Sequence, residues 1–176
     1  TLTFILTGCF SDPIGEVKEE EGLVWQEFSN DYFVMQHPKG WQHTSYMGED
    51  NLGNRSYHSL FAEKVDIVNE DVSNPATTIM YQPSWLERLS EGETTKGYLE
   101  DSWNTFVNLY KSEGLFISKD KYEIDGNDAF EIIYQNTQKD IVTLQVQTYN
   151  KKHLYNFIFV EKAHNFTNNE ELARHM

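Results

Sequence analysis

The sequence predicts an α+β fold in which an antiparallel β-sheet is flanked by helices. Strand-like segments occur on both sides of one long amphipathic helical segment, and four of them follow it in a row with short polar connections. The 176 residues include 11 Phe, 10 Tyr and 4 Trp, which is enough apolar material for the core of one domain. A disordered acidic chain would contain far fewer aromatic residues.

The segment before the helix predicts five strands. Ser29-Asn30-Asp31 has turn composition, and Pro38-Lys39-Gly40 interrupts an extended stretch that restarts at Trp41. The expected strands are 24–28, 32–37, 41–47, 57–64 and 77–82.

The helix is expected at 95–113, because apolar residues recur there at the spacing of one helical face. These residues are Leu99, Trp103, Phe106, Val107 and Tyr110. Thr94 or Thr95 can cap its start, and Gly114 stands where a left-handed residue commonly ends a helix. A stripe of this kind is typical of core packing, so we assign it no ligand.

A meander of four antiparallel strands should follow, at 115–124, 128–135, 141–149 and 153–161. Asp125-Gly126 is a favoured hairpin turn between the first two. The fourth strand is apolar on both faces, which predicts a central position with both faces covered. A last helix is expected at 165–176 with its cap near Thr167 or Asn168; it ends without a C-cap, so we expect the natural chain to continue.

Charge and cysteine content exclude several classes of protein. Asp and Glu total 28 against 14 Lys and Arg, a net charge of −14 that would repel nucleic acid. The single cysteine excludes a disulfide framework and a cysteine-rich zinc site. The sequence also has no Gly-rich phosphate loop, Gly-x-Ser-x-Gly motif or His-Glu-x-x-His motif, so we assign no catalytic residues.

The N-terminus carries the strongest functional signal. Residues 1–8 are uncharged and mostly apolar, and the composition turns polar and acidic directly after Cys9. Eight residues are too few to cross a bilayer, so we interpret them as the end of a secretory signal peptide. Leu6-Thr7-Gly8-Cys9 resembles the lipobox of bacterial lipoproteins, which implies cleavage before Cys9 and lipid attachment to its sulfur. The alternative is an ordinary apolar N-terminal strand with an incidental cysteine.

Three segments therefore organise the chain. Residues 1–8 are the signal-peptide end, residues 9–22 are a lipid-anchored acidic tether, and residues 23–176 are the folded domain. The tether contains the run Glu19-Glu20-Glu21 and buries nothing obvious, so we expect a flexible, solvated spacer.

Three motifs in the domain resemble the PsbP-like superfamily, which includes the photosystem II protein PsbP, a Ran-binding import factor and bacterial DcrB-like lipoproteins. They are Pro38-Lys39-Gly40-Trp41, the hairpin segment 122–129 (Tyr-Glu-Ile-Asp-Gly-Asn-Asp-Ala) and Tyr155-Asn156-Phe157-Ile158-Phe159. The resemblance covers about residues 23–166 and implies an α/β/α sandwich whose members bind partners and are not enzymes as a rule. Together with the lipobox, it favours a bacterial lipoprotein.

One cluster of candidate metal ligands surrounds a predicted loop. His37, His43, Glu49, Asp50 and His58 lie within 22 positions, and zinc and similar ions accept imidazole and carboxylate ligands together. The alternative is a set of scattered surface histidines.

Trp85 is a candidate partner-binding residue. It lies in Pro83-Ser84-Trp85-Leu86, ahead of the helix, where an exposed aromatic side chain could anchor another protein. Core packing is the alternative for Trp85. We expect Trp103 to lie in the core and Trp41 to plug one end of the sheet.

From these observations we expect a monomeric, membrane-anchored, non-enzymatic lipoprotein of the cell envelope that acts by binding a protein or a ligand. It would face away from the cytoplasm, on the cell membrane or the outer membrane. No cofactor is expected beyond the covalent lipid on Cys9. The alternative is an envelope protein that binds a divalent metal through the region of His37, His43 and His58.

Overall fold

The computed structural model describes residues 23–49, 55–66, 71–73, 75–82, 89, 91–136, 140–150 and 153–176. The predictions for the signal-peptide end at 1–8, for Cys9, for the 9–22 tether, for Asp50 and for Trp85 concern residues outside these ranges. No helix in the described ranges is both long and apolar enough to span a membrane.

The elements alternate much as the sequence predicts. The strands are β1 (Trp25–Ser29), β2 (Val34–Pro38), β3 (Gln42–Glu49), β4 (Arg55–Ala62), β5 (Val65–Asp66), β6 (Asp71–Val72), β7 (Ala76–Gln82), β8 (Phe116–Ile124), β9 (Asn127–Asn136), β10 (Ile141–Asn150) and β11 (His153–Lys162). The helices are α1 (Thr95–Ser112), between β7 and β8, and α2 (Ala163–His175), after β11.

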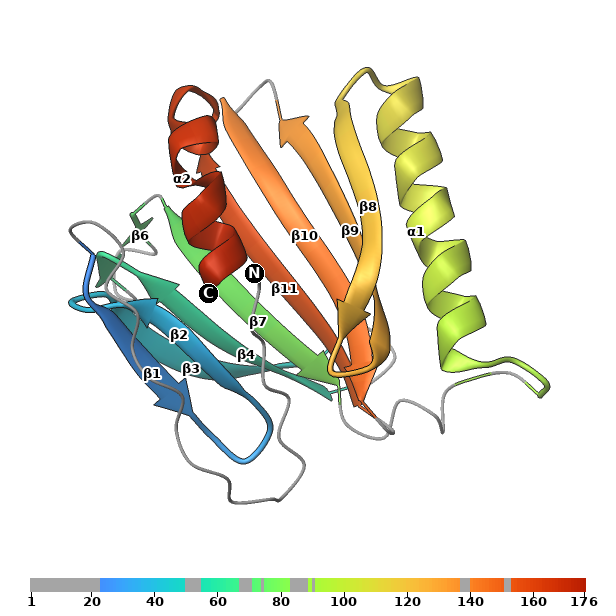
Figure 1. Ribbon diagram of the computed structural model, residues 1–176, viewed down its shortest axis with the longest axis horizontal. Coiled ribbons are helices and arrows are strands. Elements are labelled where there is room, and N and C mark those ends of the chain that lie inside the picture. Colours follow the sequence, from blue (N-terminus) through green and yellow to red (C-terminus); the bar gives the residue numbers. More distant parts are fainter. Residues whose placement is uncertain are drawn as a thin grey trace.

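Seven strands form one antiparallel sheet in the order β3-β4-β7-β11-β10-β9-β8. The predicted meander β8-β9-β10-β11 is therefore confirmed. β1 and β2 form a separate hairpin, and β5 and β6 form another. The α+β prediction, a sheet flanked by helices, is correct. Figure 1 shows α2 and the β1–β2 hairpin in front of the sheet.

The two helices cover opposite faces of the sheet, because side chains alternate along each strand. Leu99, Trp103 and Val107 of α1 pack against Phe130 and Ile132 of β9. The other face is covered by α2 and by the β1–β2 hairpin, and it holds the larger part of the core. That part includes Phe33, Phe61, Leu144, Phe157, Phe159 and Phe166.

The helix α1 matches its prediction closely. Thr94 is the N-cap, and its hydroxyl oxygen accepts a hydrogen bond from the backbone N–H of Gly97 at 3.0 Å. Gly114 has a φ of +70°, the left-handed conformation that the sequence predicts at the helix end. Leu99 is fully buried, so the apolar stripe is core, as expected.

β11 lies between β7 and β10, which confirms the central position predicted from its composition. Tyr155, Phe157 and Phe159 point into the larger core, whereas Leu154 packs with α1 on the opposite face. On the neighbouring β10, Val142, Leu144 and Val146 share the larger core as their alternation predicts.

The helix α2 begins earlier than predicted, and the predicted cap near Thr167 or Asn168 is wrong. Helix geometry starts at Ala163, directly after β11, with Lys162 as an N-cap whose side chain makes no capping hydrogen bond. Two other acceptors bind the backbone N–H groups of Lys162 and Ala163 at the start of the helix. The Glu161 carboxylate accepts from Lys162 N at 2.6 Å, and the Asp140 carbonyl oxygen accepts from Ala163 N at 3.0 Å.

Candidate apolar binding pocket

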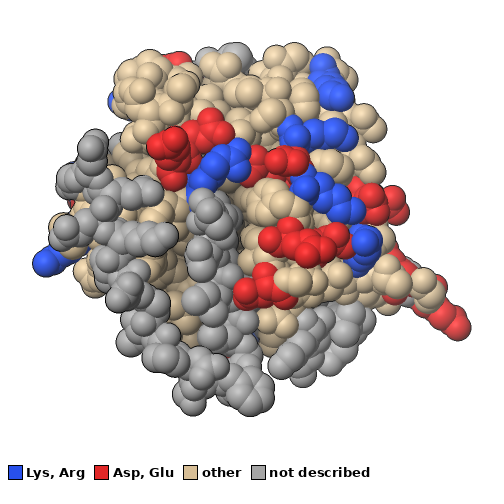
Figure 2. Space-filling view, in the orientation of Figure 1, with Lys and Arg blue, Asp and Glu red and all other residues tan. Residues whose placement is uncertain are grey.

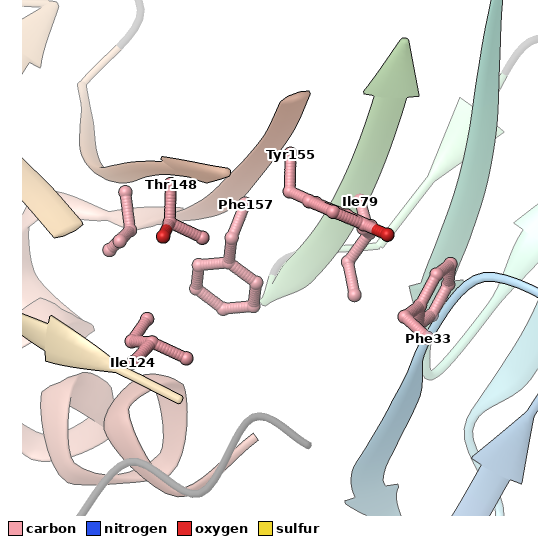
Figure 3. A pocket seen from close by; sticks show the side chains of 7 residues that line it. Phe33, Ile79, Ile124, Thr148, Tyr155 and Phe157 are labelled. Atoms are coloured by element: carbon pink, nitrogen blue, oxygen red, sulfur yellow. The ribbon is translucent and has the colours of Figure 1, made fainter. Parts of the chain in front are cut away.

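A pocket opens on the face of the sheet that also carries the β1–β2 hairpin. It is partly open to solvent: about 320 Å³ of empty space lies within it, open solvent included, and about 20 Å³ of that can hold the centre of a water-sized sphere. Figure 3 shows side chains from the sheet forming one side, with Phe33 and Ile124 at opposite ends. The lining residues are Phe33, Ile79, Ile124, Val146, Thr148, Tyr155 and Phe157.

Strand register places the sheet residues of the pocket side by side. Val146 of β10 lies opposite Phe157 of β11, and Thr148 lies opposite Tyr155. Phe157 is in turn opposite Ile79 of β7. Since residues directly opposite one another on antiparallel strands point to the same face, these five form a continuous apolar surface.

The ends of the pocket come from two turns. Ile124 is the last residue of β8, and it precedes the turn in which Asp125 and Gly126 both have positive φ, +50° and +72°. Phe33 precedes β2 at the other end, where the Asn30 side-chain oxygen accepts hydrogen bonds from the N–H groups of Tyr32 and Phe33.

Tyrosine stacking helps to fix the hairpin over the sheet. The ring of Tyr32, from the β1–β2 connection, lies 4.1 Å from that of Tyr81 on β7, centre to centre. Tyr81 also stacks on Tyr57 of β4 at 4.8 Å. The wall that carries Phe33 is therefore attached to the sheet by aromatic contacts.

Both hydroxyl groups of the lining already donate hydrogen bonds. Thr148 Oγ1 donates to the carbonyl oxygen of Asp128 at 3.0 Å, and Tyr155 Oη donates to that of Tyr32 at 3.0 Å. Burial raises the pKa of Tyr155 to about 12, so its phenol is neutral at physiological pH. An apolar, uncharged group fits this lining, because a charged group would lose its hydration without gaining a partner.

Two buried carboxylates lie under α2, and sequence reasoning missed both. Glu131 of β9 has 1% of its surface exposed, and Arg174 of α2 binds both of its carboxylate oxygens at 2.6 and 2.8 Å. Tyr122 Oη also donates to Glu131, at 3.2 Å. The hydrogen bonds from Arg174 to Glu131 raise the arginine pKa further above its usual value.

The second buried carboxylate, Glu161, is fully buried at the end of β11. Besides Lys162 N, it accepts a hydrogen bond from Asn169 Nδ2 at 2.7 Å. A glutamate within an apolar strand, as in Phe130-Glu131-Ile132 and in Val160-Glu161, is the sequence signal that could have found both positions. Because their oxygens are held by α2, we assign these carboxylates to fixing the helix.

The candidate histidines occupy three different strands. His37 on β2 is buried, with its Nδ1 3.1 Å from the carbonyl oxygen of Pro38. His43 on β3 packs between Phe28 and Phe61, with ring centres 4.3 and 4.7 Å away. His58 on β4 stacks on Tyr46 at 4.7 Å.

Serine hydroxyl groups lie beside two of these histidine rings. Nε2 of His43 is 2.9 Å from Ser45 Oγ, and Nε2 of His58 is 2.9 Å from Ser56 Oγ. Glu49 faces Arg55 at 3.7 Å. Within the described ranges, no three His, Cys, Asp or Glu side chains are grouped so that they could hold a metal ion. Burial is the main cause that lowers the pKa of His37, His43 and His58.

Comparison with known proteins bears on the fold. No protein-family model and no curated protein matches this sequence. Among solved structures, the solution structure of the cyanobacterial PsbP protein CyanoP from Synechocystis sp. PCC 6803 is similar, with a TM-score of 0.57 and 16% identity. The match covers 92% of this chain and 94% of that one. A Pseudomonas aeruginosa protein of unknown function gives a TM-score of 0.40 at 9% identity, over 84% and 90% of the two chains.

The likeness to CyanoP extends over nearly the whole of both chains, and it agrees with the sheet and helices described above. It concerns the fold alone at 16% identity. The chain has a PsbP-like fold.

Proposed function

We propose that this protein is a membrane-anchored lipoprotein of the bacterial cell envelope that binds a protein or ligand and is not an enzyme. The observation that carries the anchor is the position of Cys9. The chain's single cysteine stands where an uncharged, apolar segment meets a polar, acidic one, directly after Leu6-Thr7-Gly8. Its thiolate is the nucleophile that would accept a diacylglyceryl group.

Acyl chains explain how such an acidic domain would stay at a membrane. Each buried methylene contributes about 0.8 kcal/mol, so two or three chains hold a protein far more firmly than one. The chain's net charge of −14 would otherwise keep the protein off an anionic lipid surface. The anchored protein would face away from the cytoplasm, on the cell membrane or the outer membrane.

The apolar pocket supports a binding role. The hydroxyl groups of Thr148 and Tyr155 already donate hydrogen bonds, and the remaining lining side chains are apolar. A lining of this kind offers no acid, base or nucleophile for a reaction, but it can remove an apolar group from water at about 25 cal/mol per Å². The ligand we expect there is uncharged and apolar at the end that enters the pocket.

The anchor is tested by expressing the full chain behind a complete bacterial signal peptide and separating membrane from soluble protein with a phase-separating detergent. We expect the wild-type protein in the detergent phase, and mass spectrometry should find a lipid-modified Cys9 as the first residue. Cys9→Ser should move the protein to the aqueous phase with an unchanged circular dichroism spectrum. Equal partitioning of the two proteins, with residues 1–8 retained, would refute the anchor.

The metal-binding alternative would draw on His37, His43 and His58, together with Glu49 and Asp50. Its support is that these residues lie close together in the sequence. The described ones have aromatic, serine, backbone carbonyl or arginine neighbours in the structure. We therefore rank it below the binding role of the pocket, and a zinc titration separates the two.

A further inference from the structure

The seven-stranded sheet has two edges, β8 and β3, which differ in how they are protected. β8 carries Lys119, Asp120, Lys121 and Glu123, and its pairing with β9 shifts register between Phe116 and Ser118. Charges and bulges of this kind discourage another strand from pairing. Figure 2 shows acidic and basic side chains interspersed on the side of the molecule where β8 lies.

β3 has none of these protections over most of its length. Its eight residues pair with β4 without a register shift, from Gln42 opposite Ala62 to Glu49 opposite Arg55. Residues 42–48 contain no proline and no Asp, Glu, Lys or Arg. Within the described ranges, no strand pairs with the outer side of β3. An uncharged, regular edge of this length is a template for strand addition.

Apolar side chains line both faces of this edge. Tyr46 is 54% exposed and Met47 is 56% exposed, and as successive residues of a strand they point to opposite faces. Tyr57 of β4, directly opposite Met47, is 37% exposed. A strand added beside β3 would therefore find apolar contacts above and below its backbone.

Two observations disfavour a second copy of this chain as the added strand. Phe28 of β1 lies 4.3 Å from the His43 ring, so the β1–β2 hairpin lies beside β3 on the face that carries His43. Two copies paired antiparallel at β3 would be related by a two-fold axis perpendicular to the sheet, which brings both hairpins to the same face at the junction. Each copy would also carry a net charge of −14.

A single extended segment brings no second hairpin to that face, and the charge of the chain indicates the chemistry of the segment. Glu49 is the last residue of β3, and its carboxylate lies 3.7 Å from Nε of Arg55, the residue opposite on β4. A net-basic segment would be attracted to a protein of this charge, whereas an acidic one would be repelled.

We propose that the outer edge of β3 binds an extended, net-basic segment of a partner protein by antiparallel or parallel strand addition, with apolar side chains against Tyr46 and Met47. This inference deepens the protein-binding role proposed above by naming its surface. It does not depend on the lipid at Cys9 or on the apolar pocket, so either of those can fail while this proposal stands.

The test uses the full chain and a synthetic peptide, Lys-Lys-Val-Thr-Val-Thr-Val-Lys-Lys, which can form a strand of the required charge. Amide hydrogen exchange measured by NMR should show new protection within residues 42–49 when the peptide is added, and none within 116–124. The same peptide with Glu in place of every Lys should bind at least tenfold more weakly at low salt.

Two matched variants locate the site. Met47→Lys places a charge on the exposed face of β3 and should weaken binding of the basic peptide at least tenfold, while improving binding of the acidic one. Ile117→Lys does the same on β8, where Ile117 is 49% exposed, and should leave both affinities within twofold.

Protection on β8, equal loss in both variants, or absence of protection at β3 would overturn the proposal. So would concentration-dependent protection of β3 without any peptide, because that result would assign the edge to a second copy of the chain.

Discussion

Arg174 on the last helix binds both carboxylate oxygens of Glu131, a strand residue 43 positions earlier in the chain. The two nitrogen–oxygen distances are 2.6 and 2.8 Å, and Glu170, one turn before Arg174, binds the same guanidinium at 2.9 Å. This pair connects α2 to the sheet beneath it.

Arg174→Met should lower the free energy of unfolding by about 3 kcal/mol, because it leaves the buried Glu131 carboxylate without its cation. The value is at the low end of the range for buried pairs, since the Arg174 side chain is 35% exposed. Urea unfolding at pH 7 measures it. In the matched double variant, Glu131→Leu with Arg174→Met, no buried charge is left, and most of the loss should be recovered. A double variant as unstable as the single one would contradict this account.

Val146→Leu should fill part of the apolar pocket. The added methylene has space there, so we expect the free energy of unfolding to change by less than about 1 kcal/mol. Val142→Leu, on the same face of the same strand but outside the pocket, should cost about 1–3 kcal/mol through overpacking. Chemical denaturation of the two variants provides the comparison, and similar losses in both would argue against open space beside Val146.

Toluene is a suitable probe of the same pocket, because it is apolar and uncharged. We expect it to shift the methyl resonances of Ile79, Ile124 and Val146 in NMR spectra of the full chain, in a saturable manner. Val146→Leu should weaken this binding at least tenfold, whereas Val142→Leu should not. Shifts confined to residues outside the pocket would assign the probe to another site.

Stability should fall as the pH is lowered from 7.5 to 5.5. Burial lowers the pKa of His37, His43 and His58 in the folded protein, while an unfolded chain holds its histidines near pKa 6.5. The unfolded state therefore binds more protons in this window, so the stability present above about pH 6.5 is lost below it. His58→Gln should make the pH dependence shallower. Unfolding free energies that are equal at pH 7.5 and 5.5 would contradict this prediction.

Zinc titration by calorimetry addresses the metal alternative. The rings of His37, His43 and His58 contact Phe61, Phe28 or Tyr46, so we expect no saturable heat at micromolar zinc for the full chain. Saturable heat that disappears in both His43→Gln and His58→Gln would instead establish a metal site in this region.

Features fixed by neighbouring residues could be predicted from the sequence. The α1 cap at Thr94, the turn at Asp125-Gly126 and the alternation of β10 depend on spacings of a few residues, and each appears in the structure as expected. The composition of β11 likewise predicted that both of its faces are covered.

Features that depend on distant residues could not be predicted in the same way. α2 starts at Ala163 because the Glu161 carboxylate and the backbone carbonyl of Asp140, in the β9–β10 connection, accept hydrogen bonds from the N–H groups of Lys162 and Ala163. These hydrogen bonds outweigh the local capping preference of Thr167 or Asn168. The pocket likewise combines Phe33 with residues more than a hundred positions away. Pattern alone placed His37, His43 and His58 near one another in sequence, but it could not show that Phe61 packs against the rings of His37 and His43 while His58 stacks on Tyr46.

The order of the strands has a kinetic consequence. β3, β4 and β7 form one group, with the separate β5–β6 hairpin between β4 and β7 in the chain. The consecutive strands β8 to β11 form another group, and one ladder joins the two, between residues 76–82 and 154–160. Each group can assemble from contacts close in sequence, but the seam between them must wait until a long intervening chain has closed, α1 included. Folding should therefore be limited by the meeting of two preformed halves, and substitutions along the seam should slow it more than equally destabilising ones inside either half.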